Sequence, residues 1–259
     1  MRDRFTRNES SGVDSSAATA RRVPPLSLSA RFRWDVIERV VAVHRPTSVL
    51  EFGAGRGAVG ARLAATARYV GVEPDDSSRA SAVAALSGTS GRMLERLEDV
   101  DPDQRFAMVC AFEVLEHVPD DVGALRSWCT RLESGGIVLL SVPAHAGRFG
   151  PADEKVGHLR RYDRSDLDEL VARAGLSIEQ VWSTGWPMGR VVELAWNLVA
   201  RVRPGSGSAS VRSSASGRWL QPSMVVGRLW SVVAVPGIVL QRRRFADEAG
   251  TGWVVLCRR

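Results

Sequence analysis

Short apolar runs and longer mixed runs alternate along the chain between residues 47 and 142. The apolar runs, which favour strands, are 47–52, 68–73, 106–112 and 136–142. The mixed runs between them, which favour helices, are 58–67, 77–86 and 120–132. Strands that are apolar on both faces and alternate with helices are typical of a parallel sheet covered on both sides. The pattern therefore predicts a doubly wound α/β domain.

The pattern changes in the C-terminal part of the chain. A further helix is predicted at 164–174, with strands at 176–183 and 251–259. Two apolar helical runs, 188–202 and 224–240, lie between these strands, and the Gly/Ser/Pro/Arg tract that separates them is typical of a flexible linker. The predicted segments are a disordered leader (1–29), a core (30–183), a helical insertion or lid (184–250) with its flexible linker (203–217), and a final core strand (251–259).

Charge is distributed unevenly along the 259 residues. The formal net charge is +6, but residues 1–33 carry +4 and residues 201–259 carry +8, which leaves −6 on residues 34–200. A nucleic-acid-binding fold has a basic face. The acidic core therefore argues against a nucleic-acid partner. The three cysteines, Cys110, Cys129 and Cys257, are isolated, which fits a reduced cytoplasmic compartment and indicates no metal site.

A glycine-rich stretch follows the first predicted strand and contains a GxGxxG that starts at Gly55. A dinucleotide-binding loop has its first glycine directly after that strand, so that the pyrophosphate meets the helix N-terminus. Here the strand ends at Phe52, so the loop begins at Gly53 and the GxGxxG starts two residues late. The acid that ends the second strand, Glu73, suits the ribose of a dinucleotide or of another adenosyl ligand. The glycines alone leave both ligands open.

Further motifs follow the loop in a fixed order. They are E-F-G-A-G-R-G (51–57), the acidic Glu73, F-E-V-L-E-H-V (112–118) and G-G-I-V-L-L-S-V-P (135–143). Together they resemble the class I S-adenosylmethionine-dependent methyltransferases over roughly residues 34 to 183. The resemblance implies S-adenosylmethionine as cofactor and a Rossmann-like sheet of seven strands with the last strand antiparallel. In this chain the helical insertion would separate strands six and seven.

The resemblance also implies where the cofactor binds. Glu51 can accept a hydrogen bond from the amine of the cofactor, and Glu73 can accept from both ribose hydroxyls. Leu97 and Glu98 match the position that meets the adenine, while Phe112 and Glu113 lie where the crevice of an open α/β sheet forms. The predicted cofactor-binding residues are Glu51, Gly53, Ala54, Gly55, Gly57, Glu73, Leu97, Glu98, Phe112 and Glu113.

Methyl transfer from a sulfonium is an in-line displacement, which depends mainly on alignment and the exclusion of water. A hydroxyl acceptor also benefits from a general base, and histidine suits neutral pH. The polar segment 143–163 leaves the predicted active-site edge, and its His145, His158 and Tyr162 are the candidate catalytic residues. The alternative is a solvated loop in which arginines pair with acids. His117, in the L-E-H turn, is predicted to have a packing role.

The predicted function is methyl transfer from S-adenosylmethionine to a small acceptor. A nicotinamide-dependent oxidoreductase on the same fold is disfavoured by the late GxGxxG and by the lack of a convincing Tyr-x-x-x-Lys pair. A catalytically inactive cofactor-binding protein is the second alternative, and the intact glycine loop argues against it.

The insertion bears on the acceptor and on localisation. Its second apolar run is followed by Arg242, Arg243 and Arg244, and it is short and interrupted for a membrane span. A lid over the acceptor site is the first interpretation, and a helix lying on an anionic membrane surface is the second. Both favour a lipophilic acceptor. We expect a cytoplasmic protein, with peripheral contact at the inner face of the membrane under the second interpretation.

Overall fold

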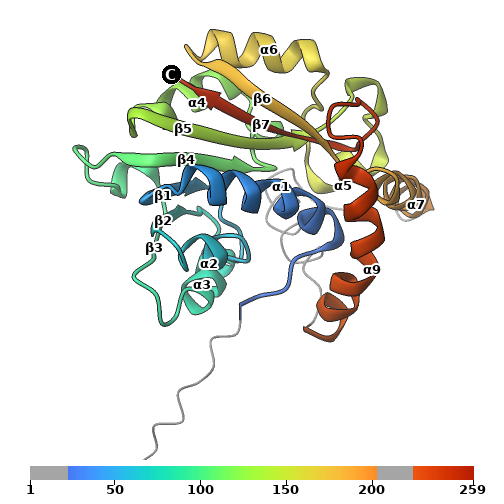
Figure 1. The fold of residues 1–259 in the computed structure, drawn as a ribbon, viewed down its shortest axis with the longest axis horizontal. Helices are drawn as coiled ribbons and strands as arrows, with labels where there is room; N and C mark the ends of the chain where they lie inside the picture. The colour runs from blue at the N-terminus through green and yellow to red at the C-terminus, as the bar shows by residue number, and fades with distance from the viewer. Residues whose placement is uncertain (1–22, 203–223) are drawn as a thin grey trace, which may run out of the picture.

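The computed structural model describes residues 23–202 and 224–259. Its seven strands form one sheet in the order β3-β2-β1-β4-β5-β7-β6 (Figure 1). The strands are β1 (Ser48–Phe52), β2 (Arg68–Val72), β3 (Arg92–Leu94), β4 (Phe106–Phe112), β5 (Leu132–Pro143), β6 (Ser177–Thr184) and β7 (Gly252–Arg258). Strands β1 to β5 pair in parallel, whereas β7 is antiparallel to both β5 and β6. The predicted Rossmann-like sheet with an antiparallel last strand is confirmed.

Helices cover both faces of this sheet. They are α1 (Leu28–His44), α2 (Gly60–Leu63), α3 (Asp76–Ala85), α4 (Asp121–Cys129), α5 (Pro151–Val156), α6 (Arg164–Arg173), α7 (Met188–Val202) and α9 (Met224–Arg242). Three short 3-10 turns are η1 (Leu97–Asp99), η2 (Leu115–His117) and η3 (Ala146–Arg148). Successive side chains of each strand point to opposite faces of the sheet. In β1, Leu50 packs in the cluster with α4 and α6, while Val49 packs in the cluster with α1.

The N-terminal boundary of the packed chain lies before the predicted residue 30. Helix α1 begins at Leu28, where the Ser27 hydroxyl accepts a hydrogen bond from the backbone N–H of Ala30. Leu26 and Leu28 are already buried. Burial of these apolar side chains, which the leader's composition did not indicate, attaches the residues before the helix to the core.

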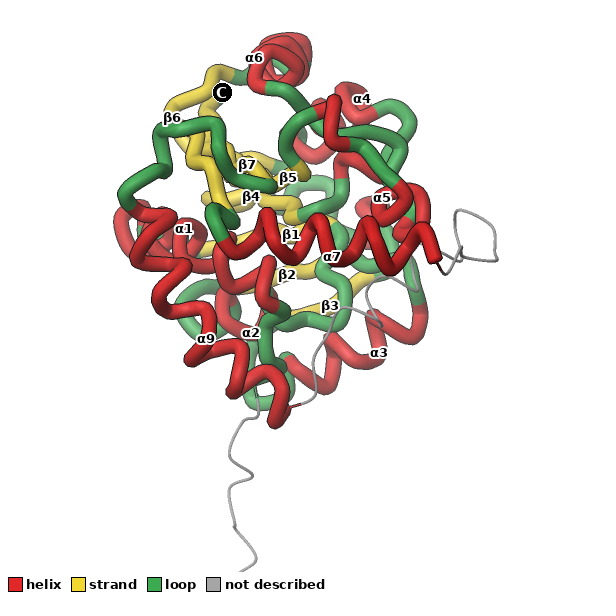
Figure 2. Tube along the Cα trace, turned by 90° about the vertical axis from the view of Figure 1, so that its right-hand side faces the viewer, coloured by secondary structure: helices red, strands yellow, loops and turns green. Residues whose placement is uncertain are grey.

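The helical insertion between β6 and β7 is present, and it is attached to the core at α1. Helix α9 packs against α1 through Ala234 and Phe32, and Arg242 forms an ion pair with the buried Asp35. Helix α7 lies across the end of the sheet toward which the parallel strands point (Figure 2). The predicted linker at 203–217 lies outside the described residues. None of the described helices combines the length and hydropathy that crossing a bilayer requires.

Candidate active site

The site lies where the parallel strands end. Ligands bind in open α/β sheets outside the carboxyl ends of the strands, at the point where the strand order reverses. In this sheet that point lies between β1 and β4, which pair with each other while β2 lies on the other side of β1. The glycine loop follows β1 and the Phe112–Glu113 pair ends β4. The topology therefore brings two of the predicted site segments to one crevice.

The glycine loop needs its glycines for different reasons. Gly53, Gly55 and Gly57 all have positive φ, at +64°, +54° and +78°, a region that side chains resist. A Cβ on Gly53 would lie 2.5 Å from Val114 Cγ2, and one on Gly57 would lie 2.8 Å from Ala82 Cα. A Cβ on Gly55 meets no protein atom within 4 Å. Gly53 and Gly57 thus serve internal packing, whereas Gly55 leaves open space that a ligand can approach.

Glu51 lies at the base of the crevice and is 2% exposed. The Tyr69 hydroxyl donates a hydrogen bond of 2.5 Å to its Oε2. The pKa of Glu51 is raised to about 7, mainly by burial, while the Tyr69 hydrogen bond lowers it and the charge of Glu73 raises it. A carboxylate with a raised pKa in a buried pocket favours a cationic partner. The primary amine that the resemblance places here would be such a partner.

Glu73 links the end of β2 to the glycine loop. Its two carboxylate oxygens accept hydrogen bonds from the backbone N–H groups of Gly55 (2.8 Å) and Asp75 (2.9 Å). Burial raises the pKa of Glu73, and these two backbone hydrogen bonds oppose the shift. Each carboxylate oxygen can accept a second hydrogen bond. Glu73 can therefore hold the loop and still accept from a ligand hydroxyl.

The two predicted adenine contacts lie in η1, after β3. Leu97 is half-buried against the core cluster that contains Leu50, and Glu98 is exposed. Neither residue lines the cavity described below. Because they follow β3, they lie at the same carboxyl end of the parallel strands as the glycine loop, beside the outermost strand of the sheet.

Glu113, at the end of β4, has a strained backbone with φ of +58°. Strain of this kind in a non-glycine residue is uncommon and concentrates at functional sites. The carboxylate is held on both sides, because Ser141 Oγ donates to Oε1 at 3.1 Å and Arg33 Nη1 lies 3.4 Å from Oε2. Arg33 belongs to α1 and was not among the predicted site residues.

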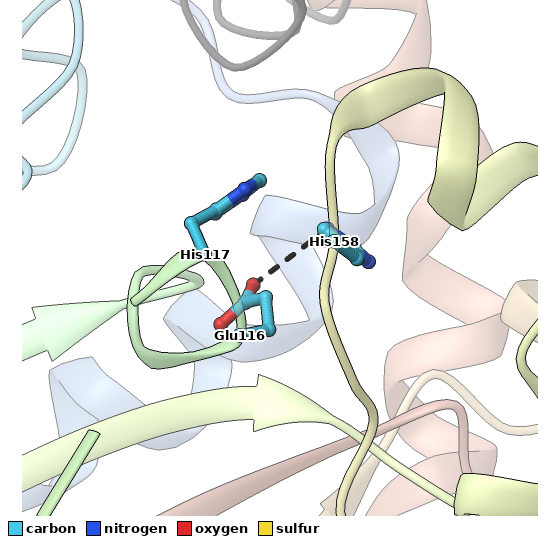
Figure 3. Close-up of side chains that lie close together, drawn as sticks. All are labelled: Glu116, His117 and His158. Carbon is cyan, nitrogen blue, oxygen red and sulfur yellow. Dashed lines mark ion pairs between the residues drawn. The ribbon is translucent and has the colours of Figure 1, made fainter. Parts of the chain in front are cut away.

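His158 and His117 lie side by side beyond β4, as Figure 3 shows. His158 Nδ1 lies 2.7 Å from Asp153 Oδ1, and His117 Nδ1 lies 3.1 Å from the Gly157 carbonyl oxygen. The two ring centroids are 4.8 Å apart. Burial, and then the neighbouring His158, lowers the pKa of His117. Its surroundings thus favour the neutral form of His117, whose ring is held by a backbone carbonyl.

The other two candidate catalytic residues lie elsewhere. Tyr162 is 3% exposed within a core cluster, and its hydroxyl donates to Asp121 Oδ2 at 2.9 Å. His145 has a φ of +68° and its ring lies 5.5 Å from that of Trp253. Burial, and then the charge of Arg148, lowers the pKa of His145. Neither residue lines the cavity beside the glycine loop.

One cavity joins the glycine loop to the end of β4, and we call it the crevice cavity. Its walls include the following predicted residues: Glu51, Gly53, Ala54, Gly55, Phe112, Glu113 and His158. His117 also lines it, although the sequence predicted a packing role for that residue. The segment before α1 and the first turns of the helix form a further wall, through residues such as Leu26, Ala30 and Arg33. No sequence motif marks that wall, because it forms only when α1 packs on the sheet.

Comparison with known proteins identifies the class that this fold and crevice define. A family model described as "Methyltransferase domain" matches residues 19–181. The match covers more than half of the chain, and the chain therefore belongs to the class I S-adenosylmethionine-dependent methyltransferase family. The nicotinamide-dependent oxidoreductase is not favoured.

Two curated relatives carry similar names. A Bradyrhizobium protein named "Ubiquinone biosynthesis O-methyltransferase" is 40% identical over 81 residues, which cover 29% of this chain and 31% of that protein. A Mycolicibacterium smegmatis protein named "Probable S-adenosylmethionine-dependent methyltransferase" is 31% identical over 137 residues, covering 51% of this chain and 52% of that protein. The matches thus span about a third and about half of the relatives' length.

Solved structures share the fold at low sequence identity. The [4+2]-cyclase SpnF superposes with a TM-score of 0.57 at 17% identity, covering 89% of this chain and 82% of that one. An S-adenosylmethionine-dependent methyltransferase from Mesorhizobium loti superposes with a TM-score of 0.55 at 15% identity, covering 90% and 100% of the two chains. One of the two is named a cyclase, so the shared fold does not by itself define the reaction.

Proposed function

We propose that this chain transfers the methyl group of S-adenosylmethionine to a small acceptor bound in the crevice cavity. The proposal rests above all on one observation, that the glycine loop, His117 of η2 and His158 open into the same cavity. When bound, S-adenosylmethionine supplies an electrophilic methyl group on a sulfonium. The residues present fit it, because a Cβ on Gly55 would occupy open space and Glu51 is a buried acid for its amine.

The chain's own residues have separate parts in this proposal. Glu51 and Glu73 hold the cofactor at the ends of β1 and β2. His158 acts on the acceptor, because Asp153 fixes its Nδ1 and leaves Nε2 to take the proton of an acceptor hydroxyl. The hydroxyl loses that proton, its oxygen forms the new bond to the methyl group, and S-adenosylhomocysteine leaves. The wall that excludes water is formed by Pro25, Leu26, Ser27, Ser29, Ala30 and Arg33.

A labelled-methyl screen tests the proposal. The purified protein is incubated with cofactor that carries an isotope-labelled methyl group, together with cell extract divided into soluble and lipid fractions. We expect label in one small-molecule product, and none with the Gly55→Val variant, whose new side chain fills the open space beside the loop. A protein that binds the cofactor but labels nothing in either fraction would instead be the catalytically inactive alternative.

The outer face of α7 supports a lipophilic acceptor that is reached from an anionic lipid surface. The exposed positions Val191, Leu194, Leu198 and Val202 repeat at helical spacing and form one apolar stripe. The opposite side of the helix carries the polar contacts, since Glu193 pairs with Arg161 and Asn197 Oδ1 accepts from the Ala152 N–H at 3.1 Å. A stripe of this kind favours a membrane interface.

Vesicle sedimentation tests the lipid contact. We expect co-sedimentation with anionic vesicles at low ionic strength and less binding as salt is raised. The paired change Leu194→Gln and Leu198→Gln should release the protein. The arginine cluster is a poorer target, because Arg242 pairs with Asp35 and Arg244 pairs with Asp247 within the fold. Dimers in place of vesicle binding would assign the stripe to a second copy, and the lipid proposal would then fail.

A further inference from the structure

Glu116 is a buried acid whose carboxylate has no hydrogen-bond partner among the described residues. It is 0% exposed, and neither of its carboxylate oxygens accepts a hydrogen bond from the part of the chain that the structure describes. The nearest ring nitrogen, His158 Nε2, lies 3.8 Å from Oε1 (Figure 3). Burying a carboxylate without hydrogen bonds or a counter-charge is costly. The position therefore favours a cation closer to the carboxylate than the His158 ring, which lies beyond hydrogen-bond distance.

Two histidines lie close to Glu116, and each is held at its Nδ1. His158 Nδ1 lies against the Asp153 carboxylate and His117 Nδ1 lies against the Gly157 carbonyl oxygen. In a neutral ring whose Nδ1 donates to such an oxygen, Nε2 carries the lone pair that can bind a metal ion. Metal-binding histidines are characteristically held by a carboxylate or carbonyl at the other ring nitrogen.

The support behind His158 is itself fixed. Asp153 Oδ1 also accepts from Arg161 Nε at 2.9 Å, and its Oδ2 accepts from the Gly150 N–H at 2.9 Å. The backbone N–H of Leu159 donates to the Glu116 carbonyl oxygen at 2.8 Å, which joins the two segments directly. Hydrogen bonds thus hold the turn η2 and the segment around His158, about 40 residues apart in the chain, against each other.

The charges nearby also favour a cation. Two further acids, Glu113 and Asp153, act on Glu116 from nearby. Arg33 pairs with Glu113 at 3.4 Å and Arg161 pairs with Asp153 at 2.9 Å. The arginines in this region are thus paired to the other two acids, and Glu116 keeps a place for a cation.

We propose that Glu116, His117 and His158 bind one divalent transition-metal ion at the wall of the crevice cavity. One ligand atom from each residue lies within 4.8 Å of the others. Ligand atoms around one zinc ion lie about 3–4 Å apart, because each bond is about 2.0–2.2 Å, so the three side chains need to close by about 1 Å. Two imidazoles and one carboxylate favour zinc, iron(II) or cobalt over magnesium or calcium.

The ion would refine the role of His158 in methyl transfer, and this part of the inference rests on the proposed function. His117 and His158 line the cavity, so an open coordination position would face the acceptor. An acceptor hydroxyl bound there through its oxygen has a lowered pKa and loses its proton to solvent, while the oxygen takes the methyl group. His158 then holds the ion instead of taking the proton. The acceptor class is one that binds a metal through a hydroxyl or phenol oxygen.

Metal titration of the full chain tests the site without cofactor or acceptor. Protein freed of metal with a chelator is titrated with ZnCl₂ by calorimetry and with CoCl₂ by visible absorption. We expect one ion per chain, and at least tenfold weaker binding in His117→Ala, His158→Ala and Glu116→Gln. His44→Ala, which removes an imidazole at the end of α1, is the matched control and should bind like the parent.

Melting curves of the same samples show that the variants are folded. Zinc should raise the melting temperature of the parent and of His44→Ala, but not of His158→Ala. Equal zinc affinity in the parent and in Glu116→Gln would overturn the proposal, as would a parent that binds no zinc. S-adenosylmethionine calorimetry on the same protein keeps a failure of the metal site separate from a failure of the proposed methyl transfer.

Discussion

The two sides of the crevice are built in different ways. On the β1–β2 side, Glu51 meets Tyr69 and Glu73 meets Gly55, and each pair is 18 residues apart in one β-loop-helix-β unit. On the β4–β5 side, His117 meets Gly157 across 40 residues, and Glu113 pairs with Arg33 of α1.

The polar groups of the two sides also differ in how they are satisfied. Both carboxylates of the first side accept hydrogen bonds from the protein, whereas the Glu116 carboxylate on the second side accepts none from the described residues. The β1–β2 side is local and its acids are hydrogen-bonded, which suits binding of a cofactor that many proteins share. The β4–β5 side joins distant segments and leaves the Glu116 carboxylate without hydrogen bonds from the described residues, which suits binding of the acceptor, the substrate that differs between such proteins.

The largest effect on this comparison is expected within the glycine loop. Gly55→Val should abolish S-adenosylmethionine binding, by more than about 100-fold, with a modest stability loss of about 1–2 kcal/mol from the positive φ. Gly57→Val should instead cost mainly stability and less S-adenosylmethionine binding, because its side chain would collide with Ala82. Calorimetry and chemical denaturation of both variants measure the two effects. Equal loss of binding and stability in both variants would contradict the division between ligand and packing glycines.

On the other side of the crevice, His158→Ala should lower turnover by about 100-fold or more, because it removes either the proposed base or a ligand of the proposed ion. The affinity for S-adenosylmethionine should hardly change, since His158 faces the acceptor. His145→Ala should have a smaller effect, because His145 does not line the crevice cavity. Production of S-adenosylhomocysteine with the labelled fraction from the screen gives the rates. A large rise in the cofactor's dissociation constant for His158→Ala would contradict this separation.

The buried acid of the cofactor side should leave a signature in the pH dependence of stability. Folding raises the pKa of Glu51 from 4.5 to about 7, so the native state keeps a proton that the unfolded chain releases in this window. Ionising the buried Glu51 therefore lowers the free energy of unfolding. This loss is absent below pH 4.5, grows between the two pKa values and is complete above pH 7, where it reaches about 3 kcal/mol.

Glu51→Gln removes that loss and provides the check. The variant should be more stable than the parent at pH 8 and no more stable at pH 4.5, while binding S-adenosylmethionine more weakly. Denaturant titrations of both proteins at the two pH values measure the difference. A stability gain that is the same at both pH values would contradict the assignment to Glu51.

A smaller effect is expected at the end of β2. Glu73→Ala should weaken S-adenosylmethionine binding by about 1–3 kcal/mol through lost charge-assisted hydrogen bonds. Glu73→Gln, which keeps one acceptor oxygen for the Gly55 N–H, should lose less. Unchanged affinity in Glu73→Ala would show that the ribose lies elsewhere.

The sequence predicted the cofactor side well because that side is local. Apolar runs mark β1, β2, β4 and β5, and the motifs that follow them carry the resemblance that implied a seven-stranded sheet with an antiparallel last strand. Strand β3 spans only Arg92–Leu94, too short to give a periodic signal, and the pattern alone did not reveal it.

The second side was harder to predict because it depends on tertiary contacts. The L-E-H turn was visible in the sequence, but the approach of His158 to Glu116 requires segment 143–163 to fold back onto η2. The wall formed by Leu26 and Arg33 likewise appears only when α1 packs on the sheet. Tyr162 was a candidate because it lies among polar residues, and the fold buries it against Asp121 instead.

The crevice beside the glycine loop is where we expect S-adenosylmethionine to bind. Calorimetric titration of the purified parent with S-adenosylmethionine, and separately with NADH, measures this binding. We expect one S-adenosylmethionine bound per chain and no measurable binding of NADH. Binding of NADH in preference to S-adenosylmethionine, or binding of neither, would contradict this expectation.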